Sequence, residues 1–223
     1  MKSIRQAFLD KYLDPSESLG EVLFGLIMVL TFTLGAGLAT VDDREATREL
    51  LIAALGCNLA WGIIDCVMYV MTALFERSRT ARLARRVRSA RDDEHAIAMI
   101  AGELEEHLAG VSSAAARRTL YDDVATTVRN AEPTRTSITR DDIVGGIASF
   151  LLVFTTALPA VVPFLIIDDS VHALRASNTL LIGMLFLAGY QWGRETNARP
   201  WITGLTIMLF GAVLVFVAIQ LGG

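Results

Sequence analysis

The chain has 223 residues, of which 53% are hydrophobic, and its mean hydropathy is +0.47. A soluble domain of this length could bury a core, but it would not carry several long uncharged stretches, so the composition indicates an integral membrane protein. The formal net charge of -4 is mild and gives no indication of nucleic acid as a partner.

Five long apolar stretches dominate the sequence. Each has roughly the ~20 residues that an α-helix needs to cross a bilayer core of ~30 Å. We therefore predict an all-α membrane protein with five transmembrane helices and a helical cytoplasmic insert between spans two and three. The stretches are residues 22–41, 50–75, 143–167, 176–193 and 200–223.

Residues 1–19 come before the first span and have the pattern of a short amphipathic helix. Ile4, Phe8 and Tyr12 fall on one side of such a helix, and basic residues lie nearby. This pattern is typical of a helix in the headgroup region of a bilayer. Spans one and two then occupy residues 20–75.

The predicted insert, residues 76–142, contains twelve basic and twelve acidic residues. No Gly or Pro occurs from Ile63 to Arg91, which predicts one helix that continues from span two and carries a row of Arg near anionic headgroups. Short helices broken near Gly102 and Gly110 follow, and then a helix from about Ser113 to Asn130. Spans three to five occupy residues 143–223.

The distribution of basic residues predicts the orientation of the chain. Of the 20 basic residues, 17 precede the first span, lie in the insert or lie between spans four and five. The positive-inside rule then places the N-terminus and the insert in the cytoplasm and the C-terminus outside. The high Arg and Ala content is typical of bacteria, so we expect a multi-pass protein of the cell (inner) membrane.

Asp65 is the one charged residue inside the five stretches. A carboxylate at membrane depth is costly and is a functional hypothesis by default. Asn58 and Met68 or Tyr69 share its helix face, and such a stripe could line a cation or proton route. The alternative is a structural hydrogen bond from a protonated Asp65 to a neighbouring helix. Cys57 and Cys66 lie in the same span on different faces and are expected to form no disulfide.

In span one, Glu21 and Met28 share a helix face. Glu21 would lie at the cytoplasmic mouth, where it could collect cations or simply lie among the headgroups. Met28 could be a soft metal ligand, although a Met in an apolar helix usually serves packing.

The insert offers a second candidate site. Glu103, Glu106 and His107 form an i, i+3, i+4 cluster, and His95 continues the same stripe. Carboxylates and imidazole suit Fe(II), Mn(II) or Zn(II), but a second helix, with Asp122 for example, would have to complete the ligand set. Otherwise these residues are solvated surface charges.

Span three carries Pro159 and Pro163. Proline inside a membrane helix frees carbonyl groups and kinks the axis, which can serve ion passage or simply set the helix shape. No phosphate-binding loop, nucleophile elbow or zinc-protease motif occurs, so we expect no enzyme.

The chain resembles the vacuolar iron transporter family. The resemblance covers the five-span layout, the opening of span one and, most specifically, the third span with its Ala-Ser-Phe start and two Pro before a Phe-Leu end. The matching residues are Glu21-Val22-Leu23-Phe24-Gly25, Gly146-Ile147-Ala148-Ser149-Phe150-Leu151, Ala157, Pro159, Pro163, Phe164 and Leu165.

The sequence departs from this family at two membrane positions. Met28 occupies the place of the family's span-one aspartate, and Asn58-Leu59 with Gly62 replaces its Ser-Met pair in span two. Asp65, about two turns further on, then takes over the charge. The family's cytoplasmic insert binds metal through Glu residues, and Glu103 and Glu106 fit that pattern.

The resemblance implies a homodimer that exchanges Fe(II) or Mn(II) for protons, with no prosthetic group. The expected function is therefore export of a divalent metal from the cytoplasm. The alternative is a membrane scaffold or metal sensor that keeps the fold and binds a partner through its cytoplasmic helices.

Overall fold

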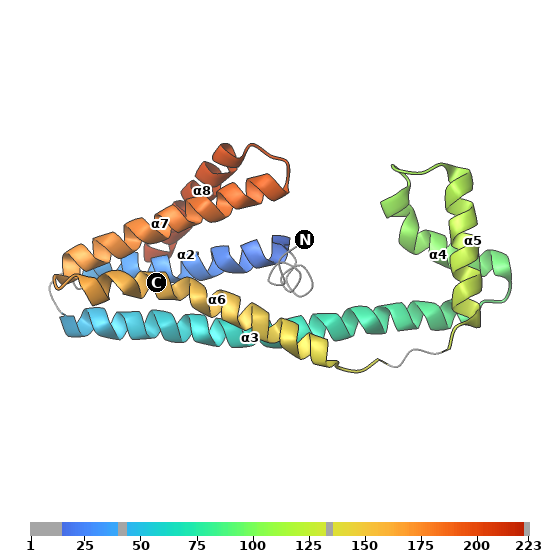
Figure 1. Cartoon of the computed structure of the whole chain (residues 1–223), viewed down its shortest axis with the longest axis horizontal. Helices are drawn as coiled ribbons and strands as arrows, with labels where there is room; N and C mark the ends of the chain where they lie inside the picture. Colours follow the sequence, from blue (N-terminus) through green and yellow to red (C-terminus); the bar gives the residue numbers. More distant parts are fainter. Residues whose placement is uncertain (1–14, 40–43, 133–135, 221–223) are drawn as a thin grey trace, which may run out of the picture. The chain divides into compact units, whose positions relative to one another are not determined.

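A computed structural model of the chain describes residues 15–39, 44–132 and 136–220, and these residues form seven α-helices without any strand (Figure 1). Four of the helices, α3, α6, α7 and α8, are long and apolar enough to cross a membrane. A shorter apolar segment, Ser18–Leu34, lies within α2. The helices are α2 (Pro15–Ala39), α3 (Arg44–Arg88), α4 (Asp93–Leu108), α5 (Ala114–Asn130), α6 (Arg140–Ile166), α7 (Ser170–Glu195) and α8 (Pro200–Gln220).

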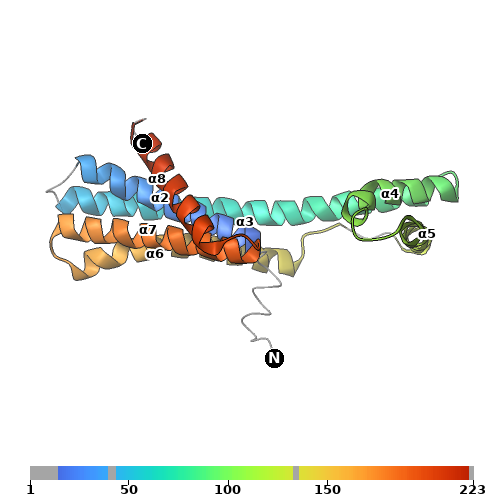
Figure 2. The ribbon, with the colours of Figure 1, turned by 90° about the horizontal axis from the view of Figure 1, so that it is seen from above.

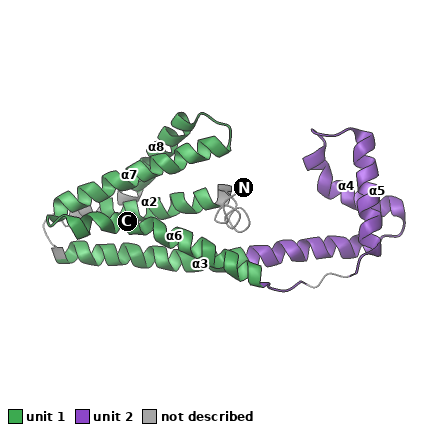
Figure 3. Cartoon of the chain, in the orientation of Figure 1, with its two compact units in different colours: residues 1–70, 140–223 green, residues 71–139 purple. Residues whose placement is uncertain are grey.

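The chain divides into two compact units, shown in Figure 3. Unit 1 comprises Met1–Val70 and Arg140–Gly223, and unit 2 comprises Met71–Thr139. Helix α3 contributes to both units, because the unit boundary falls at Val70 within it.

The core of unit 1 is built from helices α2, α6, α7 and α8. Helix α7 packs on α2, α6 and α8, and α2 also contacts α6 and α8. In Figure 2, α6 and α7 run alongside each other and α8 crosses them obliquely. The buried side chains that meet in this core are Leu26, Val29, Leu30, Ala157, Ala160, Leu181, Leu185 and Val215.

Glycines allow α3 and α6 to approach closely in unit 1. A Cβ atom added at Gly62 of α3 would lie 3.1 Å from the Phe150 carbonyl oxygen of α6. A Cβ atom added at Gly146 of α6 would lie 2.8 Å from the Cys66 carbonyl oxygen of α3. Cys57 and Cys66 are both free thiols, as predicted.

Unit 2 packs α4 and α5 against each other. Asp92 caps α4 by accepting a hydrogen bond from the His95 backbone N–H at 2.8 Å, and Ser113 caps α5 through the Ala116 N–H at 3.3 Å. The small buried core contains Val87, from the end of α3, and Ala96, Ile97, Ile100, Tyr121 and Ala125.

The helix boundaries confirm the continuous helix from Ile63 through the Arg-rich stretch and the helix expected from about Ser113 to Asn130. Two expectations were wrong. The start of the apolar stretch at residue 50 suggested that the second span begins there, but helix α3 begins at Arg44, where Glu45 in its first turn favours helix formation. Helix α4 runs through Gly102, because a single glycine weakens a helix without ending it. Most of the predicted N-terminal amphipathic helix, residues 1–14, lies outside the described residues.

Candidate functional site

Two carboxyl groups meet between α2 and α3 in unit 1. The side chains of Glu21, near the start of α2, and Asp65, in the apolar part of α3, are in hydrogen-bonding contact. An ionised carboxylate can only accept hydrogen bonds, so two carboxyl groups can bond to each other only when one of them holds a proton. The pair is therefore a site that can hold and release a proton within an otherwise uncharged apolar stretch.

Asn58 provides a second polar contact between the same two helices. Its side chain is fully buried, and its Nδ2 donates to the Gly25 carbonyl oxygen at 3.5 Å. A Cβ atom at Gly25 would overlap the Thr156 hydroxyl of α6, so only glycine fits where α2, α3 and α6 meet. The contacts Glu21–Asp65 and Gly25–Asn58 together define an antiparallel register for α2 and α3.

This region contains buried oxygen atoms whose hydrogen-bonding capacity is not used. Asp65 Oδ2 and Asn58 Oδ1 are both buried and have no hydrogen-bond partner within the described residues. Such atoms are rare in proteins, because each one costs desolvation energy that a water or an ion would recover. Asn58 and Asp65 are seven residues apart, or about 10 Å along the helix axis, so they form two successive positions along α3.

The remaining predicted pathway residues lie on α2 and α6. Met28 is half-buried, one turn beyond Gly25 on α2. Pro163 is buried and Pro159 half-buried, and both lie inside the uninterrupted helix α6. The buried Ser177 hydroxyl of α7 donates to the Ala160 carbonyl oxygen at 2.9 Å, between the two prolines.

The acidic residues of α4 make ion pairs within unit 2. Glu103 pairs with Arg79 of α3 at 2.7 Å, and Glu105 pairs with Arg117 of α5 at 3.1 Å. The Tyr121 hydroxyl also donates to Glu105 Oε2 at 2.8 Å. Burial of Tyr121 and its bond to Glu105 raise the pKa of the phenol above its usual value. These carboxylates therefore stabilise the packing of the unit.

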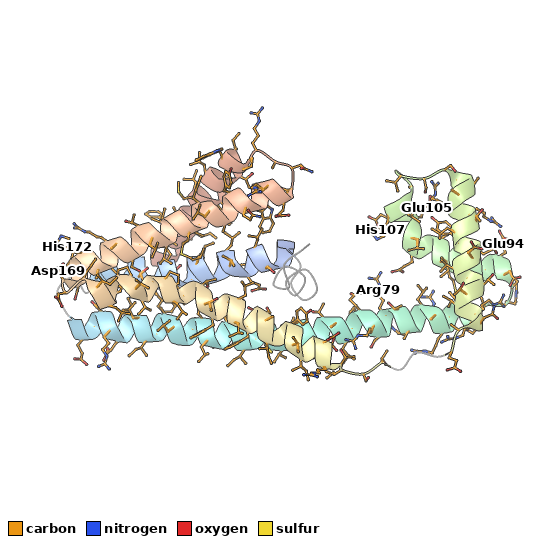
Figure 4. The ribbon with its side chains drawn as sticks, viewed as in Figure 1. Arg79, Glu94, Glu105, His107, Asp169 and His172 are labelled. Atoms are coloured by element: carbon orange, nitrogen blue, oxygen red, sulfur yellow. The ribbon has the colours of Figure 1, made fainter. Side chains whose placement is uncertain are left out.

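The other predicted metal ligands of the insert, His95, Glu106, His107 and Asp122, are exposed side chains (Figure 4 labels Glu105 and His107). Over the residues with a described placement, no three His, Cys, Asp or Glu side chains come together as a metal site. His95, Glu106 and His107 all lie on α4, and α5 contributes Asp122. The geometry therefore concentrates the candidate chemistry in unit 1, at the Glu21–Asp65 pair.

A third feature occurs at the turn between α6 and α7. Asp169 caps α7, because its Oδ1 accepts hydrogen bonds from the His172 backbone N–H at 2.8 Å and lies 2.7 Å from the ring Nδ1 (Figure 4). The backbone N–H of His172, and then its ring, lower the pKa of Asp169.

Glu21 and Asp65 lie on different helices, so the pattern of either helix alone does not predict their contact. The sequence does contain a signal for this contact. Glu21 and Asp65 lie at nearly equal sequence distances from the connection at residues 40–43. Two antiparallel helices joined by a short connection bring positions at equal distances from it side by side. In comparisons with known proteins, no protein-family model matches the chain and no curated protein matches it.

Proposed function

We propose that the chain is a transporter that moves a divalent metal cation, iron or manganese, across the membrane in exchange for protons, out of the cytoplasm. The observation that carries the proposal is the contact between Glu21 and Asp65. A carboxyl pair that holds a proton becomes a dianion when it loses that proton, and this dianion matches the charge of a divalent cation. Proton and cation would therefore compete for one site.

The neighbouring residues support a path that leads to this pair. Asn58 offers a buried amide oxygen two turns away on α3, and oxygen ligands suit Mn(II) and Fe(II). Met28 adds a soft donor on α2, the helix that carries Glu21. Pro159 and Pro163 lie in α6, which meets α2 at Gly25 and Thr156. The resemblance to vacuolar iron transporters supports the choice of metal.

The proposal includes the full topology expected from the sequence. In it, α2 is the first of five spans, the N-terminus and residues 76–142 are cytoplasmic, the C-terminus is outside, and two copies form a homodimer. The uneven distribution of basic residues supports the orientation.

A second candidate function is a membrane scaffold or metal sensor that binds a partner through unit 2. One observation favours it: the acidic residues Glu94, Glu103 and Glu105 are paired with arginines of the same unit. Carboxylates held in this way stabilise the α4–α5 packing and are poor candidates for capturing metal on the way to the membrane.

The test is flux of Fe(II) or Mn(II) into liposomes that contain the purified protein and a pH-sensitive dye. We expect the wild-type protein to move metal with an opposite proton flux. Asp65→Asn and Glu21→Gln should each lower the initial rate by at least about tenfold, which corresponds to ~1.4 kcal/mol. Asp123→Asn, an exposed acid of α5, is the matched control and should leave the rate unchanged.

Absence of flux for both metals in the wild-type protein would remove the transport proposal and leave the scaffold or sensor as the leading function. Normal flux in the Asp65→Asn variant would show that the carboxyl pair is not the transport site.

A further inference from the structure

The Arg-rich part of α3 contains two kinds of arginine. Three of its arginines interact with groups of unit 2. Arg77 donates to the Ser137 carbonyl oxygen at 2.5 Å, Arg79 pairs with Glu103 at 2.7 Å, and Arg88 donates to the Ala131 carbonyl oxygen at 3.1 Å.

Arg82, Arg85 and Arg86 form the second kind. All three are exposed, and no acidic side chain in the described part of unit 2 lies within ion-pair distance of them. Their i, i+3, i+4 spacing places them on one face of α3. Three positive charges therefore share one helix face, and no acidic side chain with a described placement pairs with them.

An aromatic ring extends this face toward the apolar part of the helix. The Arg82 guanidinium lies 5.7 Å from the centre of the Phe75 ring, and Phe75 is 58% exposed. Phe on an apolar side beside Arg on a polar side is typical of helix surfaces at the boundary between hydrocarbon and headgroups. Phe75 and Arg82 are about 10 Å apart along the helix, and the headgroup layer is roughly 5–8 Å thick, so the long arginine side chains can reach the phosphate level.

We propose that Phe75, Arg82, Arg85 and Arg86 form a binding surface for anionic phospholipids. The guanidinium groups bind the headgroup phosphates, with which they form paired hydrogen bonds, and the Phe75 ring lies at the edge of the hydrocarbon. A lipid is the occupant favoured over an acidic protein or a nucleic acid, because the surface begins where the apolar stretch of the same helix ends. This surface requires insertion in a membrane but does not depend on metal transport.

The test measures lipid preference with the full-length protein in phosphatidylcholine nanodiscs that contain a small fraction of spin-labelled phosphatidylglycerol or spin-labelled phosphatidylcholine. The quantity compared is the association of the two labelled lipids with the protein. The double variant Arg82→Gln and Arg86→Gln should lower the preference for phosphatidylglycerol about tenfold or more, since each arginine near the surface contributes about fivefold.

The matched control is the double variant Arg79→Gln and Arg88→Gln, which removes the same charge from the same helix. We expect its preference to change less than about twofold, because these two arginines already bind groups of unit 2. Changing Arg82, Arg85 and Arg86 together to Lys should keep most of the preference, because the charge is retained.

Equal losses in the two double variants would overturn the proposal, since only net charge would then matter. A wild-type protein without preference for phosphatidylglycerol, or a preference that survives Arg82→Gln and Arg86→Gln, would also overturn it. The helical circular dichroism of each variant shows whether it is folded, and the exposed Arg82 and Arg86 should be replaceable without loss of structure.

Discussion

Substitution of Gly146 by alanine tests the close contact between α3 and α6. The added Cβ atom would lie 2.8 Å from the Cys66 carbonyl oxygen, 3.1 Å from its Sγ atom and 3.3 Å from Val70 Cγ2. A rotation of the Cys66 side chain could relieve the second contact but not the first, because the carbonyl belongs to the backbone. The two helices would have to separate by about 0.6 Å to restore ordinary contact at 3.4 Å.

The expected magnitude follows from two opposing effects. Overpacking typically costs about 1–3 kcal/mol, whereas alanine in place of glycine favours a helix by up to ~1 kcal/mol. The control Gly183→Ala, inside α7, should show only the favourable effect, because no atom lies within 4 Å of the added Cβ. The two variants should therefore differ by about 1–3 kcal/mol in stability, or roughly 2–12 °C in melting temperature for a chain of this size.

The assay is thermal unfolding of the purified protein in detergent, followed by circular dichroism, for wild type and both variants. Metal flux is measured in parallel. Cys66 follows Asp65 directly in α3, so a displacement at Gly146 should also disturb the Glu21–Asp65 contact and slow transport in Gly146→Ala alone. Equal melting temperatures of the two variants, or a more stable Gly146→Ala variant, would refute the packing argument.

Two further predictions concern titratable groups outside the membrane segments. The raised pKa of Tyr121 means that the folded state keeps the phenol proton to higher pH than the unfolded state does, so this stabilisation is present below about pH 10 and is lost as pH rises through the folded pKa. In an alkaline absorbance titration, the tyrosine signal that disappears in Tyr121→Phe should therefore titrate at higher pH than an ordinary tyrosine. Titration of that signal at the ordinary pH of tyrosine would contradict the assignment. The lowered pKa of Asp169 stabilises the fold above its unfolded pKa of about 3.9, and this contribution is lost as pH falls through the folded value. Asp169→Ala should lower the melting temperature at neutral pH. Asp169→Asn should lower it much less, because Asn also caps helices. An equal fall in melting temperature in both variants would show that the capping hydrogen bond contributes little.

The sequence predicted the helices well because their signals are local. The apolar stretches give the long helices, and the uninterrupted run from Ile63 to Arg91 predicts the continuation of α3. Ser113 at the start of α5 is an ordinary capping signal. The region around Gly102 misled because glycine weakens a helix without necessarily ending it, and the start of α3 misled because its first turn is polar.

The contacts between helices were harder to predict. Asp65 was recognised as costly at membrane depth, but its partner Glu21 depends on the register of α2 against α3. In the same way, the acidic stripe of α4 could be interpreted as metal ligands or as solvated surface charges, because Arg79, the partner of Glu103, lies on another helix. Periodicity describes one helix at a time, whereas ion pairs depend on how the helices pack.

The ion pairs of unit 2 also make its packing sensitive to ionic strength. Arg79–Glu103 and Arg118–Glu94 are exposed pairs, whose attraction is screened over about 8–10 Å at physiological salt and over less in concentrated salt. The core of unit 1 has no charged member, and apolar burial is strengthened by salts that are excluded from protein surfaces. Unit 2 also has a small apolar core, so concentrated sulfate should weaken its ion pairs while it strengthens apolar burial in both units. The solvent itself can thus shift the α4–α5 packing from charged contacts to apolar ones.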